Sequence, residues 1–253
     1  MRTILLEQEK IYRGNLILVN ANYPLRTFQD EGLIPADMRF PKIRIKVEAA
    51  NLLQLILRKI HCYNEIVPVS GYRTVKEQRK IYTDSMHDNG ESFTRKYVAL
   101  PNHSEHQTGL AIDLGIKKEK IDFIRPDFPY EGICQEFRKA AAHYGFIERY
   151  QNSKEKITGI AHEPWHFRYV GYPHSEIMST KGLSLEEYVD LIKEFQYGKE
   201  HLFRDHDGKQ MEIFYVPCDA KGTEILVAEK SVYQVSGNNT DGFIVTLWRN
   251  NNE

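Results

Sequence analysis

Apolar residues recur along the chain with a helical spacing in four segments. Within residues 43–62 they fall close to one face of a helix, at Val47, Ala50, Leu53, Ile56 and Leu57. The other three segments are residues 74–86, 134–145 and 184–198. Thr74 followed by Glu77 has the spacing of a capping box, which predicts where the second helix begins. Gly145 predicts the end of the third helix, because glycine adopts the left-handed conformation found there.

Other segments are strand-like, with apolar and polar residues that alternate or with short apolar runs. They are residues 15–20, 65–73, 109–115 and 166–170. In residues 109–115 the leucines and Ile112 point to one side, while Ala111 and Asp113 point to the other, which is typical of a half-buried strand. Residues 87–103 are polar and irregular, so we predict a loop there.

After Gly198 the pattern changes to short strand-like segments separated by turn signals. The segments read MEIFYVPC, TEILVA, SVYQV and GFIVTLW, and the turns include DAKG and SGNNTDG. This predicts a small β-rich appendage of about 50 residues, near the lower limit for a domain that folds by itself. We therefore expect an α+β protein with two domains, residues 1–198 and residues 199–253.

Composition narrows the class of protein. Hydrophobic residues make up 41% and charged residues 27% of the 253 residues, as in ordinary soluble proteins. The 34 basic and 35 acidic residues balance, which gives no reason to expect a nucleic-acid or anionic-membrane partner. Three distant cysteines argue against a disulfide framework.

The apolar run at the N-terminus ends at Glu7, which makes it too short for a signal peptide, and no membrane anchor is expected. We expect a cytoplasmic protein.

Two polar stretches indicate metal chemistry. In SEHQTGLAID, residues 104–113, Asp113 lies on the non-core face of its predicted strand, and the turn at Gly109 can bring His106 back over that face. In HEPWHFR, residues 162–168, His166 also lies on the non-core face of a strand. Two imidazoles and one carboxylate suit zinc with an open fourth position. Glu163 would lie just off the strand end, where it could take a proton from water instead of binding the metal.

Competing interpretations carry less weight. A lone histidine is more often a hydrogen-bonded or surface residue than a ligand, and an aspartate on a strand is usually just solvated. HEPWH matches the H-E-x-x-H zinc motif, but that motif needs a helix, and Pro164 inside one would cost roughly 3 kcal/mol. We therefore do not expect His162 to be a ligand. SKEK, residues 153–156, fits the S-x-x-K pattern of some serine enzymes. It lies in a polar loop, and so short a pattern often arises by chance.

Three motifs together resemble a known family. SGYR (70–73), SEHQTGLAID (104–113) and EPWHFR (163–168), in this order, are similar to the VanY-type D-alanyl-D-alanine carboxypeptidases of peptidase family M15. The family's pattern is S-x-H-x-x-G-x-A-x-D followed by E-x-W-H, and the resemblance covers roughly residues 15 to 197. It implies a compact α+β zinc domain, shared with the hedgehog signalling domain and with van-type D,D-dipeptidases. The segment after Gly198 lies outside the family pattern.

The resemblance also implies roles for individual residues. The implied ligands of a Zn²⁺ ion are His106, Asp113 and His166. Glu163 would be the catalytic base, and Arg73 would bind the terminal carboxylate of the substrate. Ser104 and Gln78 match positions that contact substrate in relatives.

The implied activity is hydrolysis of the peptide bond before a C-terminal D-alanine. The substrates would be small peptides ending in D-alanine, either the D-Ala-D-Ala dipeptide or a peptidoglycan precursor pentapeptide. Because no anchor or signal is visible, the resemblance favours the bifunctional D,D-dipeptidase/D,D-carboxypeptidases linked to glycopeptide resistance, such as resistance to vancomycin. One alternative is an L,D-carboxypeptidase that acts on cell-wall tetrapeptides. Another is a non-catalytic zinc module that binds the cell wall, although such a module has no need of Glu163 or Arg73.

Overall fold

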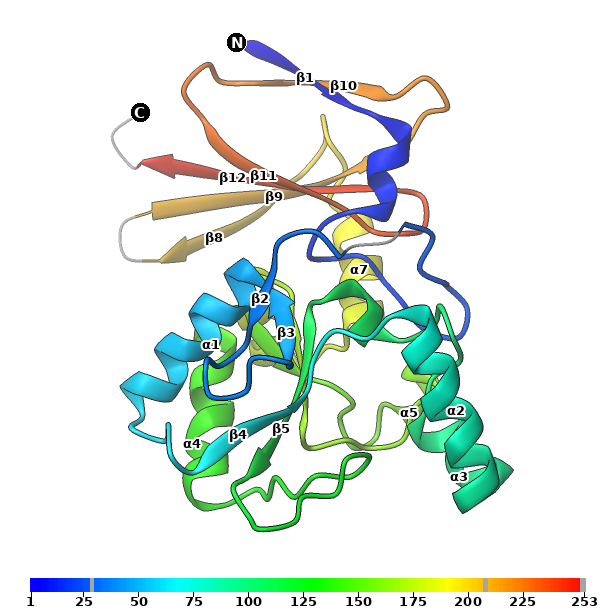
Figure 1. Cartoon of the computed structure of the whole chain (residues 1–253). Coiled ribbons are helices and arrows are strands. Elements are labelled where there is room, and N and C mark those ends of the chain that lie inside the picture. The colour runs from blue at the N-terminus through cyan, green and yellow to red at the C-terminus, as the bar shows by residue number, and fades with distance from the viewer. Residues whose placement is uncertain (28–29, 207–208, 251–253) are drawn as a thin grey trace. The chain divides into compact units, whose positions relative to one another are not determined.

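The computed structural model describes residues 1–27, 30–206 and 209–250, and the chain forms two compact units (Figure 1). One unit is Val19–Ser184, and the other joins Met1–Leu18 to Leu185–Glu253. The predicted domains, residues 1–198 and 199–253, are a different division of the chain and stay a prediction. The units differ from them because the helix α7 (Leu185–Lys193) packs on strand β9 (Lys209–Pro217), which keeps this helix with the C-terminal strands.

An antiparallel sheet of four strands organises the unit Val19–Ser184. Its strands, in spatial order, are β4 (Ile66–Ser70), β5 (Ala111–Ile116), β7 (His166–Tyr169) and β6 (Phe146–Glu148). The strands predicted around residues 65–73, 109–115 and 166–170 are thereby confirmed. In the ladder Asp113 lies directly opposite Ser70 on one side and His166 on the other. Because side chains alternate along a strand, Asp113 and His166 project from the same face.

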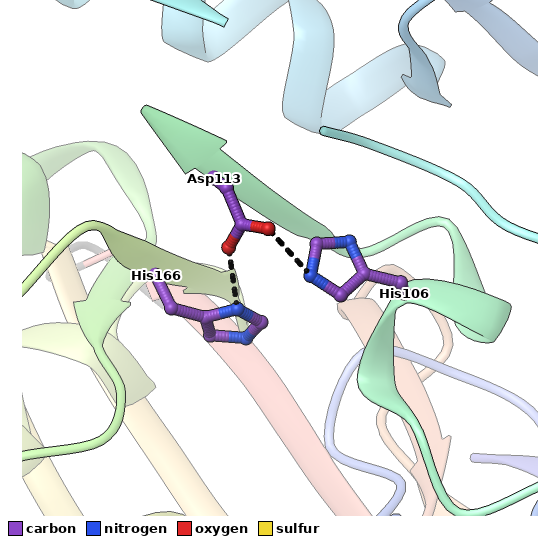
Figure 2. Close-up of side chains that lie close together, drawn as sticks. All are labelled: His106, Asp113 and His166. Atoms are coloured by element: carbon purple, nitrogen blue, oxygen red, sulfur yellow. Dashed lines mark hydrogen bonds and ion pairs between the residues drawn. The ribbon is translucent and has the colours of Figure 1, made fainter. Parts of the chain in front are cut away.

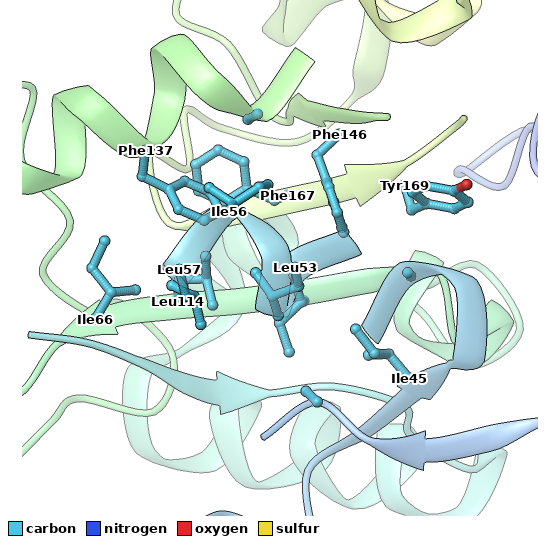
Figure 3. Close-up of a cluster of buried hydrophobic side chains, with 14 of the residues drawn as sticks. Ile45, Leu53, Ile56, Leu57, Ile66, Leu114, Phe137, Phe146, Phe167 and Tyr169 are labelled. Atoms are coloured by element: carbon cyan, nitrogen blue, oxygen red, sulfur yellow. The ribbon is translucent and has the colours of Figure 1, made fainter. Parts of the chain in front are cut away.

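The opposite face of this sheet carries the hydrophobic core. Helices α1 (Val47–Lys59) and α4 (Gly132–Ala141) cover it, and α4 continues into the short helix η3 (Ala142–Tyr144). Figure 3 shows side chains of both helices and of the strands in contact. The labelled residues are Ile45, Leu53, Ile56, Leu57, Ile66, Leu114, Phe137, Phe146, Phe167 and Tyr169. Each fully buried side chain of this size contributes about 1.5–3 kcal/mol, so the core holds the sheet rigid beneath the polar face.

Two further helices lie on the other side of β4 and β5 in Figure 1. They are α2 (Val75–Asn89) and α3 (Glu91–Tyr97). The predicted capping box begins α2: the Thr74 hydroxyl accepts a bond from the Glu77 amide at 3.2 Å, and the Glu77 carboxylate accepts one from the Thr74 amide at 2.7 Å. The loop predicted for residues 87–103 is wrong in its first half. There α3 packs on α2 through a buried hydroxyl pair, Ser85 and Thr94, 2.8 Å apart.

The remaining elements of this unit are short. They are the hairpin β2 (Leu33–Pro35) and β3 (Arg44–Lys46), the helix η2 (Glu105–Thr108), and helices α5 (Glu155–Thr158) and α6 (His174–Lys181). Gly109 ends η2 with φ of 72°, a left-handed conformation that glycine adopts without strain. A Cβ at this position would lie 2.7 Å from Leu33, so the tight turn also depends on the missing side chain.

The second unit is rich in strands, as the sequence predicts. One sheet has the order β11 (Val232–Gly237), β12 (Gly242–Asn250), β9 and β8 (Leu202–His206), and a second pairs β1 (Arg2–Leu6) with β10 (Thr223–Val227). The helix η1 (Gln8–Tyr12) belongs to this unit, whose core consists of Leu6, Ile11, Phe214, Val216, Ile225, Val227, Phe243, Val245 and Leu247. The predicted α+β class is confirmed for the chain. Among the described helices, none is long and apolar enough to cross a bilayer.

The strand predicted for residues 15–20 is wrong. These residues form turns and irregular backbone, although Leu16 to Val19 are buried. Their backbone groups bond near the end of β11 without forming a ladder: the Leu16 amide donates to the side-chain hydroxyl of Ser236 at 2.9 Å, and the Leu18 amide donates to the Asn238 carbonyl at 3.1 Å. A buried apolar run therefore does not require a sheet when other acceptors are near.

Candidate metal centre

Three side chains from separate segments converge on the polar face of the sheet (Figure 2). His106 comes from η2, Asp113 from β5 and His166 from the first residue of β7. The Nε2 atom of His106 lies 3.1 Å from one Asp113 oxygen, and the Nδ1 atom of His166 lies 2.9 Å from the other. One ligand atom from each residue lies within 4.8 Å of the other two, and all three side chains are buried.

The backbone explains why these residues meet. Asp113 and His166 are direct partners in the ladder between β5 and β7. The left-handed turn at Gly109 reverses the chain, so that His106 returns over the same face despite its opposite parity in the sequence. The structure therefore has the turn that the sequence predicts at this glycine.

The donor atoms fit a zinc ion. The Nδ1 atom of His106 lies 2.7 Å from the carbonyl oxygen of Gly71, which can only accept, so Nδ1 carries the proton and Nε2 keeps its lone pair. That lone pair faces the oxygen of Asp113. Two electron-rich atoms this close favour a cation between them, and two donors on one tetrahedral zinc lie roughly 3.3 Å apart. Imidazole and carboxylate are both ordinary zinc ligands, so the donor chemistry agrees with the spacing.

Glu163 lies beside this cluster without joining it. Its carboxylate is 3.9 Å from the Nδ1 atom of His166, and only 6% of the residue is exposed. Burial raises the pKa of Glu163 to about 8. A carboxyl group with such a pKa can both accept and release a proton near neutral pH.

His162 lies apart from the cluster. Its ring is stacked on Tyr130, and the Nε2 atom of His162 is 2.7 Å from the Tyr130 hydroxyl. Residues 162–165 are not helical. The helical H-E-x-x-H interpretation is therefore excluded by the backbone, as the proline inside it indicates.

Arg73 follows β4 and reaches the cluster from the side. Its Nε donates to the Ser70 hydroxyl at 2.9 Å, and its Nη1 donates to the Gln78 side-chain oxygen at 3.3 Å. Its Nη2 lies 3.0 Å from Asp113 and 3.3 Å from the Nε2 atom of His106. The guanidinium is therefore held by neighbours on two elements and faces the same space as the histidines.

A single cavity of about 40 Å³ joins these groups. Its polar lining contains every residue that the sequence predicts for the site: Arg73, Gln78, Ser104, His106, Asp113, Glu163 and His166. Aromatic and aliphatic side chains complete the wall, among them Tyr97, Phe123, Tyr150 and Trp165. Convergent polar groups within an apolar rim are typical of a binding site for a small molecule.

The protonation states of the cluster depend strongly on one another. Burial would raise the pKa of Asp113, but His106 and His166 hold it well below its usual range. Burial and Arg73 lower the pKa of His106 to about 4. Burial also disfavours the charged form of His166, but hydrogen bonds to Asp113 and Glu105 outweigh it and raise its pKa to about 9. A bound divalent cation would favour the neutral ring, because it adds positive charge beside it.

Sequence reasoning missed a second layer of charge behind the cluster. Glu105 is 1% exposed, and its carboxylate contacts the Nε2 atom of His166 at 3.2 Å. Arg168 and Arg149, both buried, pair with the same carboxylate at 2.6 Å and 3.2 Å. The alternation in β7 places Arg168 on the same face as His166, which was the one available signal. Burial of a complete charge network cannot be deduced from spacing.

Comparison with known proteins agrees with the motifs. A family model described as VanY, D-alanyl-D-alanine carboxypeptidase, matches residues 42–172. The bifunctional D-Ala-D-Ala dipeptidase and D-Ala-D-Ala carboxypeptidase VanXYC of Enterococcus gallinarum is 42% identical over 181 residues, which cover 71% of this chain and 95% of that protein.

Solved structures extend the likeness to nearly the whole chain. The vancomycin resistance D,D-dipeptidase VanXYg, in complex with a D-Ala-D-Ala phosphinate analog, is 61% identical with a TM-score of 0.96, over 98% of this chain and 99% of that chain. A mutant of the vancomycin resistance D,D-pentapeptidase VanY from a VanB-type cassette, in complex with Zn(II), is 28% identical with a TM-score of 0.57. That match covers 69% of this chain and 98% of the other.

Proposed function

The chain belongs to the VanY family of D-alanyl-D-alanine carboxypeptidases, and we propose that it is a zinc peptidase that releases C-terminal D-alanine. Its substrates are D-Ala-D-Ala and peptidoglycan precursor pentapeptides ending in D-Ala-D-Ala, the chemistry of glycopeptide resistance. One observation supports this above all: residues from all three motifs line one cavity. The likeness to a dipeptidase with a D-Ala-D-Ala analog and to a bifunctional enzyme supports both substrates.

In this proposal His106, Asp113 and His166 hold the zinc ion. When bound, the ion supplies a Lewis acid that polarises the substrate carbonyl and activates water. Two neutral imidazoles and one carboxylate leave a net positive charge on the site, which favours that chemistry. The carbonyl of Gly71 orients the ring of His106 from behind.

Glu163 is the general base and then the general acid. Its carboxylate takes a proton from the attacking water and delivers it to the amine of the departing D-alanine. Its position beside His166, at 3.9 Å, keeps it near the reacting atoms without making it a ligand. The apolar wall formed by Trp165 and Tyr150 keeps bulk water away from this proton transfer.

Arg73 provides selectivity for a free C-terminus. A guanidinium pairs with a carboxylate through two parallel hydrogen bonds, and Ser70 and Gln78 fix the plane of this one. Gln78 is itself held, because its amide donates to the Ala99 carbonyl at 2.8 Å. Ser104, buried in the same lining, offers the substrate a hydroxyl.

Arg73→Lys should lower kcat/KM for D-Ala-D-Ala by about 10- to 100-fold, because one charged hydrogen bond is worth about 1.5–3 kcal/mol. Lysine keeps the charge but cannot form the bidentate pair. Steady-state kinetics measures the loss, and metal analysis verifies that zinc remains bound. Arg79→Lys is the matched control, since Arg79 lies on the exposed side of α2. Equal kcat/KM values for Arg73→Lys and the unmodified protein would show that Arg73 does not bind the substrate carboxylate.

Release of D-alanine from three substrates tests the proposed function. The substrates are D-Ala-D-Ala, a pentapeptide ending in D-Ala-D-Ala, and a tetrapeptide in which an L-residue precedes the terminal D-alanine. We expect release from the first two and none from the third. Release from the tetrapeptide alone would make the protein an L,D-carboxypeptidase. If the zinc-loaded protein releases D-alanine from none of them, it is not a peptidase of this class.

A further inference from the structure

We propose that Glu105 is a positioning residue for the metal centre, one whose carboxylate fixes the ring of His166 so that Nδ1 is presented to zinc. This inference rests on the proposed function, because it concerns the same ion. It adds a residue whose side chain is fully buried and whose effect is exerted through a ligand, His166.

The ring of His166 lies between two carboxylates. Its Nδ1 faces Asp113 at 2.9 Å, and its Nε2 faces Glu105 at 3.2 Å. In a neutral imidazole one nitrogen donates and the other accepts. Both carboxylates can only accept, so without the ion the ring can donate to each of them. When zinc takes the lone pair of Nδ1, Glu105 is the acceptor that remains, and it would keep the single proton on Nε2. A carboxylate behind a ligand histidine also makes the ring a stronger donor.

The two histidines are therefore supported in different ways. His106 donates from Nδ1 to the backbone carbonyl of Gly71 at 2.7 Å and presents Nε2. His166 uses the opposite pair of nitrogens and depends on a side chain instead of the backbone. Glu105 directly precedes His106 in η2, so a single helical turn supplies one ligand and the support of the other. Substitution at residue 105 therefore acts on the ligand that is distant in sequence.

The arginines explain how this carboxylate stays in place. Arg168 and Arg149 both contact the Oε1 atom of Glu105, at 2.6 Å and 3.2 Å, which leaves the Oε2 atom for His166. A buried carboxylate needs such partners, because an unpaired charge in the interior is strongly unfavourable. The pairs also prevent the side chain from rotating away from the ring.

A purely structural role is the competing explanation. Glu105 would then only compensate the charges of Arg149 and Arg168, and zinc would bind equally well without it once the charges balance. The two explanations differ in what happens to zinc affinity, which can be measured without substrate.

The test is zinc affinity in Glu105→Gln, measured by competition with a chromogenic chelator. We expect the dissociation constant to rise by about 10- to 100-fold, the usual cost of losing a partner behind a metal ligand. Glu148→Gln is the matched control. It removes another carboxylate that pairs with an arginine, Arg138 at 2.5 Å; the Glu148 side chain is 14% exposed and lies outside the cavity lining. We expect Glu148→Gln to lower the unfolding temperature and to change zinc affinity by less than threefold.

The double variant Glu105→Gln with Arg168→Gln separates support from charge balance. It removes one negative and one positive charge together, so we expect its unfolding temperature to exceed that of Glu105→Gln while its zinc affinity stays weak. In cobalt-substituted protein, both variants should shift the visible absorption bands, because the donor strength of His166 changes.

Zinc affinity within threefold of the unmodified protein in the double variant would overturn the positioning role. Failure of the unmodified protein itself to bind zinc would instead overturn the proposed function.

Discussion

Glu163→Ala should leave zinc bound and lower the rate of D-alanine release by about 10²- to 10⁴-fold, the usual contribution of a positioned general base. The variant keeps zinc because the three proposed ligands are elsewhere, and the carboxylate of Glu163 lies 3.9 Å from the nearest histidine nitrogen. It loses turnover because the other polar groups of the cavity are committed to the metal, to its ligands or to the substrate. Metal analysis and single-turnover kinetics on the same preparation measure both properties.

The control for this variant is Glu136→Ala. Glu136 is an exposed glutamate on α4 that pairs with Lys139 at 2.9 Å, and its removal should change neither zinc content nor rate. KM for D-Ala-D-Ala should change little in Glu163→Ala, because the base acts on water and not on the terminal carboxylate. A Glu163→Ala protein that turns over at the rate of the Glu136→Ala protein would show that another group moves the proton.

Removal of zinc with a chelator should reduce D-alanine release to background, and added Zn²⁺ should restore it. The fold should persist, because Arg73 lies 3.0 Å from Asp113 and can compensate its charge without the ion. Zinc at 100 times its dissociation constant should stabilise the protein by about 2.7 kcal/mol, provided that the unfolded chain does not bind it. Thermal unfolding and D-alanine release, each with and without the chelator, measure these effects.

A second metal provides the control for chelation. Mg²⁺ prefers octahedral oxygen ligands, so it should restore neither activity nor stability at a site with two imidazoles. The expectation fails if protein that metal analysis shows to be free of zinc still releases D-alanine at its original rate. It also fails if the chelator inhibits without removing the metal.

The side chains of the proposed metal site could be predicted from sequence because local rules place each of them. Alternation along β5 and β7 places Asp113 and His166 on the face opposite the core, and Gly109 marks the turn that returns His106. Each of these placements depends only on residues that are near one another in the sequence. The capping box at Thr74 belongs to the same class, since its atoms lie within one helical turn.

Features that depend on distant partners could not be predicted in this way. In the sequence, Glu105 is a polar residue close to a predicted turn. Only the structure shows that it is a buried charge paired with Arg149 and Arg168. Helix α3 was missed because its buried face is small and includes a hydroxyl group, Thr94, instead of an apolar stripe. Strand β8 (Leu202–His206) was missed because it lies at the edge of its sheet and carries exposed and charged residues.

If Asp113 and His166 hold zinc as proposed, the register between β5 and β7 ties metal content to correct folding. Asp113 and His166 are direct partners across one rung, so a slip by a single residue would turn one of them toward the core and separate the pair. Chains with mispaired strands would then retain much of their secondary structure yet take up no ion. The fraction of zinc per chain in a purified sample should therefore count correctly paired molecules, which spectra of helix and strand content would not distinguish.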